Sequence, residues 1–159
     1  LNTENSNYII RMSNFEEVKP VWHTYLWPKR STPIKPYSEM KFLGGYNEKM
    51  SDEPVDFWCL THKEIVVGTL SGHKSSPFHY RSRGLWIHPS HRGRELSRLL
   101  LKEVIAKALE NECSILWTAP RKKSFPAYER MGFKKTGPWL HEGFEYGPNC
   151  YAYIDLNLR

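Results

Sequence analysis

The clearest periodic pattern in the chain is a long amphipathic stretch that predicts a helix over residues 93–111. Apolar side chains recur there at three- and four-residue spacing, and charged side chains take the opposite face. The apolar positions are Leu96, Leu99, Leu100, Leu101, Val104, Ile105, Ala108 and Leu109. Strand-like segments at 80–88 and 114–119 flank this helix, so we expect a right-handed crossover between two parallel strands.

Shorter strand patterns cover much of the remaining chain. They are expected at residues 8–12, 57–61, 64–72, 133–136 and 151–156. A tight turn at His62-Lys63 would join the second and third of these segments into a hairpin. The pattern as a whole predicts an α/β (α+β) fold with a mixed, mainly antiparallel twisted sheet flanked by helices.

A first helix is expected just after the first strand. Asn14 is a typical N-cap, and Glu17, three residues on, completes a capping box. Pro20 predicts a kink or a late start, and Pro28 ends the helix. The expected apolar face consists of Val18, Val21, Trp22, Tyr25 and Leu26.

Residues 28–55 differ in composition from the segments around them. They hold four prolines and two adjacent glycines, and they predict a long connection with one short helix near Ser38–Leu43. A connection of this length in a small domain is usually functional or mobile.

Composition and charge exclude several classes of protein. The chain has 159 residues and a mass of 18.8 kDa, so we expect one domain over residues 1–159. Its 40% hydrophobic, 25% charged and 14% aromatic residues exclude a disordered tail or a collagen-like fibre. No apolar run approaches the roughly 20 residues of a membrane span, so we expect no membrane partner.

The net charge of +6 and the pI of 9.2 favour an anionic partner, which can be a nucleic acid, an acidic lipid or a phosphorylated small molecule.

The cysteines and the start of the chain bear on the cellular compartment. Cys59, Cys113 and Cys150 are odd in number and widely spaced, which argues against a disulfide framework and a zinc site, and we expect no bound metal. The chain opens without Met and without a basic-then-apolar leader, so we expect a processed or shortened start and a cytoplasmic protein.

The segment from Leu85 to Ser97 carries the strongest candidate chemistry. A strand ends at Pro89, a basic glycine-containing loop follows, and the long helix begins. Backbone N–H groups of a first helical turn, together with the positive end of the helix dipole, make an anion site. Arg92 and Arg94 add positive charge, which suits a pyrophosphate. From the spacing alone, an ordinary strand-to-helix turn with solvated arginines explains the segment equally well.

Two motifs in this half of the chain resemble a known family. The segment Trp-Ile-His-Pro-Ser-His-Arg-Gly-Arg-Glu-Leu-Ser-Arg-Leu-Leu resembles the acyl-CoA-binding motif of the GNAT superfamily of N-acyltransferases. A second segment, Ser-Phe-Pro-Ala-Tyr-Glu-Arg-Met-Gly-Phe from Ser124 onward, is similar to that family's Tyr-Glu-x-hydrophobic-Gly-Phe segment. Ser124 also resembles the cap of a short helix that carries Pro126 in its first turn and that Gly132 ends. One helix and one strand separate the motifs, and the order of elements fits, so the resemblance covers nearly the whole chain.

The chain departs from the family pattern at three positions. Glu95 stands where the first glycine of the motif is expected, and Ser97 stands at its final small position. Arg121 replaces an asparagine that is common near the second motif. Ser97 leaves room for a phosphate, whereas the carboxylate of Glu95 either repels a diphosphate or points outward and favours the helix N-terminus.

The resemblance implies acetyl-CoA as the co-substrate. The strands at 80–88 and 114–119 would diverge, and the pantetheine arm would pair with backbone groups between them. A backbone N–H near Leu85 would polarise the thioester carbonyl. The cofactor-binding residues that the resemblance implies are Leu85, Trp86, Ile87, Arg92, Gly93, Arg94, Glu95, Leu96, Ser97 and Ser124. The basic run 121–123 either meets the adenosine 3′-phosphate or forms a solvated loop.

The resemblance also implies catalytic roles. Tyr128 matches the tyrosine that donates a proton to the departing thiolate, although it can instead be a packing residue beside Met131 and Phe133. The general base stays open, because Arg81 and Arg83 lie on the strand where many members carry Glu or His. These arginines can instead hold an acidic part of the acceptor. Substitutes for the base are His73, His79, His88 and Glu39, and a water relay or an amine that arrives deprotonated would also serve.

The implied activity is transfer of an acetyl (acyl) group from acetyl-CoA to a primary amine, by direct attack in a ternary complex. The acceptor would be a small molecule or a peptide, and a homodimer is compatible with the fold. The 28–55 connection would lie on the acceptor side, and its aromatic residues either line a cleft or pack the loop; these are Trp27, Tyr37, Phe42 and Tyr46. Two alternatives remain. One is coenzyme A binding without turnover, prompted by Glu95 and the missing base, and the other is a small basic nucleic-acid-binding module, which the lack of a recognition signature disfavours.

Overall fold

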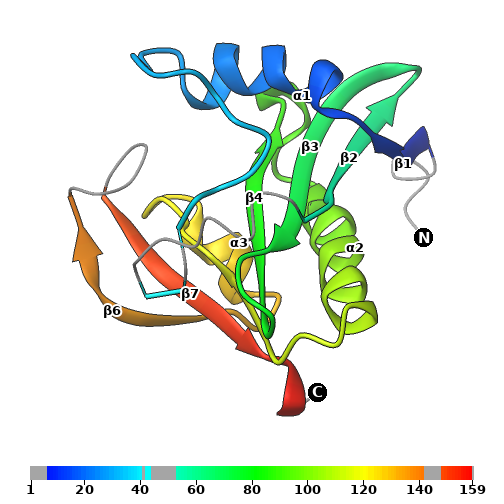
Figure 1. Cartoon of the computed structure of the whole chain (residues 1–159). Coiled ribbons are helices and arrows are strands. Elements are labelled where there is room, and N and C mark those ends of the chain that lie inside the picture. The colour runs from blue at the N-terminus through cyan, green and yellow to red at the C-terminus, as the bar shows by residue number, and fades with distance from the viewer. Residues whose placement is uncertain (1–6, 41, 44–52, 142–147, 159) are drawn as a thin grey trace.

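A computed structural model describes residues 7–40, 42–43, 53–141 and 148–158 of the chain. Among these residues, seven strands form one sheet in the order β1-β2-β3-β4-β5-β7-β6 (Figure 1). The strands are β1 (Tyr8–Ser13), β2 (Val55–His62), β3 (Ile65–Lys74), β4 (His79–Ile87), β5 (Ile115–Thr118), β6 (Lys134–Leu140) and β7 (Asn149–Asp155). The helices are α1 (Phe15–Val21), the π-helix η2 (Trp22–Leu26), the 3₁₀ turn η4 (Pro89–His91), α2 (Leu96–Glu110), α3 (Phe125–Glu129) and the 3₁₀ turn η5 (Leu156–Leu158).

Two hydrophobic clusters cover the two faces of this sheet. The larger one contains the buried leucines of α2 together with Tyr80, Tyr128 and Phe133. The smaller one joins α1 and η2 to β2 and contains Val18 and Trp22. The sheet is therefore covered by helices on both faces, as the patterns predicted. No helix in the described ranges is both long and apolar enough to cross a lipid bilayer.

The predicted crossover is confirmed, because α2 leads from β4 to a β5 that runs parallel to it. The other neighbouring strands pair in the antiparallel sense. Only three residue pairs join β4 to β5, from His79↔Ile115 to Arg81↔Trp117. Beyond Arg81, β4 continues to Ile87 with no further pairing to β5, so the two strands diverge.

A β-bulge in β4 lies where this divergence begins. The register with β3 passes from Ser71↔Arg83 to Thr69↔Trp86, which leaves Gly84 and Leu85 in the bulge. Gly84 has a φ of +76°, and a Cβ there would lie 2.1 Å from Cζ2 of Trp22. Only glycine tolerates both the left-handed backbone and the closeness of the indole.

The long helix begins three residues later than its pattern predicted. Gly93 and Glu95 both have left-handed backbones, with φ of +81° and +57°, which a helix cannot contain, so α2 begins at Leu96. Leu96, Leu100, Leu101, Val104, Ile105 and Ala108 are buried as expected, whereas Leu109 is exposed.

The first helix follows its predicted start, and its predicted face is buried at Val18 and Trp22 but exposed at Tyr25. Asn14 Oδ1 accepts a 2.9 Å hydrogen bond from the Glu17 N–H, which is half of the capping box. The Glu17 carboxylate turns instead to Arg11, at 2.7 Å. After Pro20 the helix widens into η2, where the Trp27 N–H bonds to the Trp22 carbonyl five residues back.

Two local predictions were wrong. The hairpin turn lies at Lys63-Glu64, one residue later than expected, since both residues adopt the positive φ of a tight hairpin turn. No helix forms at the described residues 38–40 and 42–43, where Met40 lies in an isolated bridge and residues 42–43 in a turn. The backbone there bonds to sheet side chains instead: the Ser38 N–H donates to His73 Nε2 at 3.0 Å.

Candidate functional site

A cavity of about 510 Å³ lies between the end of β4, the start of α2 and α3, and we call it the helix-side cavity. Nine of the ten expected cofactor-binding residues line it: Leu85, Trp86, Ile87, Arg92, Gly93, Glu95, Leu96, Ser97 and Ser124. Arg94, the tenth, is not among its lining residues. Tyr25, His91 and Arg130 also line it. Tyr25 lies outside both motifs, whereas His91 and Arg130 lie within them but were not assigned a cofactor-binding role.

The loop before α2 has the conformation of an anion cradle. Left-handed backbones at Gly93 and Glu95 turn the chain into the helix, and the first turn of α2 carries no acidic residue. The backbone explains why glycine is expected at position 95, since a left-handed conformation costs any other residue about 1–2 kcal/mol. Glu95 keeps the conformation with an exposed side chain that makes no capping hydrogen bond. The side chain of Arg92 points toward the end of β4, where its Nε donates a hydrogen bond to the Ile87 carbonyl at 2.9 Å.

A histidine and a tyrosine support the same loop. Tyr8 in β1 lies with its hydroxyl 2.7 Å from Nδ1 of His91. Burial lowers the pKa of His91, and the neighbouring His62, Arg94 and His88 lower it further. The hydrogen bond between Tyr8 and His91 ties this loop to β1, at the edge of the sheet.

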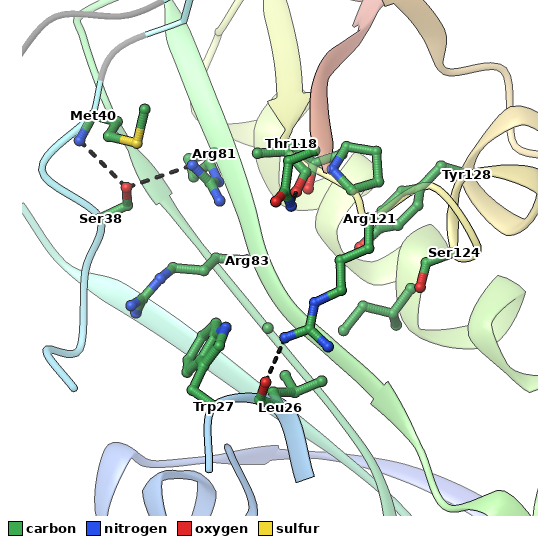
Figure 2. A pocket seen from close by; sticks show the side chains of 15 residues that line it. Leu26, Trp27, Ser38, Met40, Arg81, Arg83, Thr118, Arg121, Ser124 and Tyr128 are labelled. Atoms are coloured by element: carbon green, nitrogen blue, oxygen red, sulfur yellow. Dashed lines mark hydrogen bonds between the residues drawn. The ribbon is translucent and has the colours of Figure 1, made fainter. Parts of the chain in front are cut away.

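A second, smaller cavity of about 100 Å³ lies where β4 and β5 diverge, and we call it the central cavity. Tyr128 of α3 lines it and is only 4% exposed (Figure 2). Burial raises the pKa of Tyr128 to about 12. A hydrogen bond with Thr118 and the positive charges of Arg81 and Arg121 lower the pKa, but by less than burial raises it. The phenol is therefore protonated at neutral pH and can act as a hydrogen-bond or proton donor.

The helix-side and central cavities meet. Both are lined by Leu26, Leu85, Arg121 and Ser124. Arg121 reaches across the divergence and donates a hydrogen bond to the Leu26 carbonyl at the end of η2, as Figure 2 shows. The two motifs therefore meet at this junction: the loop before α2 lines the helix-side cavity, and Tyr128 lines the central cavity.

The basic run 121–123 does not act as one cluster. Arg121 lies at the boundary of the two cavities, Lys122 lies 5.8 Å from the ring centroid of Trp139, and Lys123 lines the helix-side cavity. Ser124 occupies the N-cap position of α3, but its side chain makes no capping bond.

A third cavity of about 450 Å³ lies along the connection after η2, and we call it the connection-side cavity. It shares Ser38, Met40 and Arg83 with the central cavity. Of the expected aromatic lining, Trp27 lines the central cavity and Tyr37 the connection-side cavity. Phe42 instead packs against other rings, among them Trp117 at 5.9 Å, and Tyr46 lies outside the described residues.

The structure narrows the candidates for a general base. His73 is buried, its Nδ1 donates to the Lys74 carbonyl at 2.9 Å, and its Nε2 accepts from Ser38. Burial lowers its pKa to about 3, so His73 is a structural residue that ties the connection to β3. His79 lines none of the three cavities, and Nδ1 of His88 accepts from the Ser90 N–H at 3.0 Å. Glu39 lines the connection-side cavity, where it is paired with Lys35.

Among the described residues, no group of three or more histidine, cysteine or acidic side chains is placed to hold a metal ion. The three cysteines are free and buried. The site is therefore built from backbone groups, arginines, aromatic rings and one buried phenol.

Comparisons with known proteins agree with this geometry. The model of the acetyltransferase (GNAT) family matches residues 18–133. A candidate N-acetyltransferase from Lactobacillus plantarum superposes with a TM-score of 0.68 at 14% identity, covering 94% of this chain and 98% of that one. A candidate acetyltransferase from Salmonella typhimurium, solved with acetyl-CoA, has a TM-score of 0.65 at 15% identity and covers 94% of each chain.

A dodecameric spermidine N-acetyltransferase from Vibrio cholerae has a TM-score of 0.67 at 14% identity and covers 96% of each chain. No curated protein matches the chain in sequence. The family model spans both motifs and most of the sheet, from α1 to the end of the α3 segment. The chain therefore belongs to the acetyltransferase (GNAT) family.

Proposed function

We propose that the protein transfers an acetyl (acyl) group from acetyl-CoA to a primary amine by direct attack within a ternary complex. The observation that carries the proposal is the meeting of the helix-side cavity with the central cavity, where protonated Tyr128 lies. The free, buried cysteines support a reducing compartment such as the cytoplasm.

The helix-side cavity fits acetyl-CoA in charge. Arg92, Arg121, Lys123 and Arg130 line it, against a single described carboxylate, that of Glu95. The first turn of α2 adds the positive end of a helix dipole with no acidic side chain to oppose it. We assign the pyrophosphate to Arg92–Ser97 and the adenosine 3′-phosphate to Lys123. The pantetheine arm would follow β4 beyond Arg81, where pairing with β5 has ended.

The acyl chemistry needs an oxyanion donor and a proton donor. Bound acetyl-CoA supplies a thioester, whose acyl carbon forms a bond to the amine nitrogen while the bond to sulfur breaks. Leu85 lies in the bulge of β4 and lines both cavities, so its backbone N–H is the proposed donor to the carbonyl oxygen. Tyr128 donates a hydrogen bond to the sulfur, which leaves as the thiolate and takes up a proton from solvent. The proton lost by the amine passes to solvent, directly or through water.

A second candidate function is coenzyme A binding without turnover. Glu95 favours it, because this carboxylate lines the cavity where the phosphates would lie. A third possibility is a basic nucleic-acid-binding module. It draws no support from the basic side chains near the two motifs, because Arg92, Arg121, Lys123 and Arg130 line the helix-side cavity.

A thermal-shift titration with acetyl-CoA, followed by detection of free thiol over a panel of amines, tests the proposal. At 100 times its dissociation constant, the ligand should add about 2.7 kcal/mol, or roughly 5–10 °C in Tm for a chain of this size. Arg92→Ala should reduce the shift, whereas Arg98→Ala, on the exposed side of α2, should leave it unchanged. No shift at millimolar acetyl-CoA would exclude the cofactor, and a shift without thiol release would favour the non-catalytic function.

A further inference from the structure

Two fully buried side chains hold one peptide group in the bulge of β4. Trp22 of η2 and Thr69 of β3 are both 0% exposed. The carbonyl of Gly84 accepts two hydrogen bonds at 3.0 Å, one from Trp22 Nε1 and one from the Thr69 hydroxyl. The donors come from two different elements, so the peptide that joins Gly84 to Leu85 is fixed from two directions.

The chemistry of the donors fixes the direction of each hydrogen bond. An indole N–H can only donate, so Trp22 donates to the Gly84 carbonyl and, at 3.3 Å, to the Thr69 oxygen. The Thr69 hydroxyl directs its own hydrogen to the Gly84 carbonyl. A hydroxyl that accepts a hydrogen bond becomes a stronger donor, above all in a buried place of low dielectric. The three groups therefore form a closed network in which each bond reinforces the others.

The glycine at position 84 is what brings the indole to the carbonyl. A Cβ on this residue would lie only 2.5 Å from Trp22 Nε1, the atom that makes the hydrogen bond. A side chain there would displace the donor as well as strain the left-handed backbone. The bulge and the network therefore depend on the same residue.

The direction of the Gly84 carbonyl determines the direction of the next N–H. A trans peptide is planar with its C=O and N–H on opposite sides, so the Leu85 N–H points away from Trp22 and Thr69. Thr69 lies on β3, and the sheet order places β5 on the other side of β4. The Leu85 N–H is thereby directed to the side where β4 and β5 have stopped pairing. Leu85 lines both the central and the helix-side cavities, whereas neither Trp22 nor Thr69 is among the described lining of either.

We propose that Thr69 and Trp22 are positioning residues, which aim and strengthen the Leu85 N–H as the hydrogen-bond donor to the acetyl carbonyl. This inference rests on the proposed acetyl transfer and assigns the residues that prepare its oxyanion donor. Hydrogen bonds to a peptide carbonyl polarise the amide, which makes its N–H a better donor. A donor fixed in advance needs no reorientation as negative charge develops on the thioester oxygen. Both side chains act through the peptide between Gly84 and Leu85.

Thr69→Val and a matched control separate positioning from the loss of a buried hydrogen bond. Thr69→Val removes the hydroxyl, keeps the shape of the side chain and leaves Trp22 on the Gly84 carbonyl. Ser71→Ala is the control, because Ser71 is also fully buried on β3 and its hydroxyl donates at 2.8 Å to the Arg83 carbonyl, one peptide earlier. Each variant loses one hydroxyl-to-carbonyl bond, so both should lose a similar amount in Tm. Thr69→Ser keeps the hydroxyl and should restore the wild-type values in every measurement.

The first measurement needs no cofactor. In ¹⁵N NMR spectra of the protein alone, Thr69→Val should move the Leu85 amide nitrogen resonance upfield, because the amide loses polarisation. Ser71→Ala should move the resonance of Gly84 instead, since each hydroxyl holds the carbonyl of the residue before the amide that it affects. Should Thr69→Val not fold, Thr69→Cys supplies the same comparison, because a thiol is a weak donor.

The second measurement uses acetyl-CoA labelled with ¹³C at the acetyl carbonyl. Isotope-edited infrared spectra of the wild-type complex should place the thioester carbonyl band at lower frequency than in free acetyl-CoA. Thr69→Val should return the band toward the free value, whereas Ser71→Ala should leave it in place. With an acceptor from the amine panel, kcat for Thr69→Val should fall roughly 3- to 10-fold at an unchanged KM for acetyl-CoA, a fraction of the effect of removing a whole oxyanion donor.

The outcomes distinguish this proposal from the acetyl transfer beneath it. A wild-type thioester band in Thr69→Val, with the Tm lowered as in Ser71→Ala, overturns the positioning role and leaves Thr69 a structural residue. A band at the free frequency in the wild-type complex overturns it without any variant. Acetyl transfer survives both results, because acetyl-CoA is bound in each. A wild-type protein that shows neither a thermal shift nor a bound thioester band refutes the acetyl transfer, and the positioning role falls with it.

Discussion

Replacing Tyr128 with phenylalanine should lower turnover without weakening the binding of acetyl-CoA. The phenol pKa of about 12 lies about 3.5 units above that of an ordinary thiol, near 8.5. Full transfer of its proton to a free thiolate is therefore uphill by about 5 kcal/mol. Tyr128 acts best as a strong hydrogen-bond donor to the sulfur while negative charge develops there. We expect kcat for Tyr128→Phe to fall about 100-fold, the lower end for a positioned acid, or about 2.7 kcal/mol.

The same substitution has a separate cost in stability. It removes the hydrogen bond with Thr118, which is buried, and this should cost about 1 kcal/mol, or about 2–4 °C in Tm. Tyr80→Phe is a matched control, because Tyr80 is also buried and donates to Asp56 Oδ2 at 3.2 Å, in the larger cluster on the sheet. It should lose similar stability and keep its turnover.

Steady-state thiol release, with an acceptor found in the amine panel, measures kcat and KM for each variant. The reasoning fails if Tyr128→Phe keeps the wild-type kcat while losing the expected stability. It also fails if affinity for acetyl-CoA falls as much as kcat, since the hydroxyl would then bind the ground state equally well. A further check is the pH profile: because the pKa is about 12, Tyr128 should produce no alkaline decline below pH 10.

Two further substitutions test the fold that positions the site. Gly84→Ala should destabilise the protein by roughly 2–5 kcal/mol in urea unfolding, because it adds backbone strain and a clash with Trp22. Gly93→Ala is the control: Gly93 has a similar φ but open space around the Cβ, so the substitution should cost only the strain. Equal losses of stability in the two variants would contradict the packing argument. His73 has a folded pKa of about 3 against about 6.5 when unfolded, so only the unfolded chain gains this proton as pH falls below 6.5. Stability should then decline by up to about 1.4 kcal/mol per pH unit, and His73→Gln should reduce the slope between pH 6.5 and 5, a window above the one in which Glu17 titrates. An unchanged slope would show that His73 is protonated in the folded protein.

Much of the architecture could be predicted because the relevant signals are local. The three- and four-residue spacing in α2 reports its buried face directly, and a helix between two apolar strands permits one handedness of crossover. The loop at 92–97 and the tyrosine at 128 could be found for the same reason, since each lies within a short contiguous motif. Periodicity did not report the start of α2, which depends on the left-handed backbones of Gly93 and Glu95.

The missed features depend on contacts between distant segments. The expected helix near Ser38–Leu43 is absent from the described residues because His73 takes the Ser38 N–H. The same contact removes His73 from the candidate bases. Arg121 appeared to belong to a basic run, and only the fold reveals that it bonds to Leu26, 95 residues away.

The sequence by itself determined the fold class, the parallel crossover and the two motifs that identify the family, because each is written in neighbouring residues. The tertiary structure alone decided how the motifs meet, since the divergence of β4 and β5 depends on a bulge whose glycine must accommodate Trp22. It also decided which charged side chains of β4 are buried. Arg81 and Arg83 are 8% and 2% exposed, and their burial depends on contacts with segments distant in the sequence, such as Trp117 for Arg81 and Trp27 for Arg83.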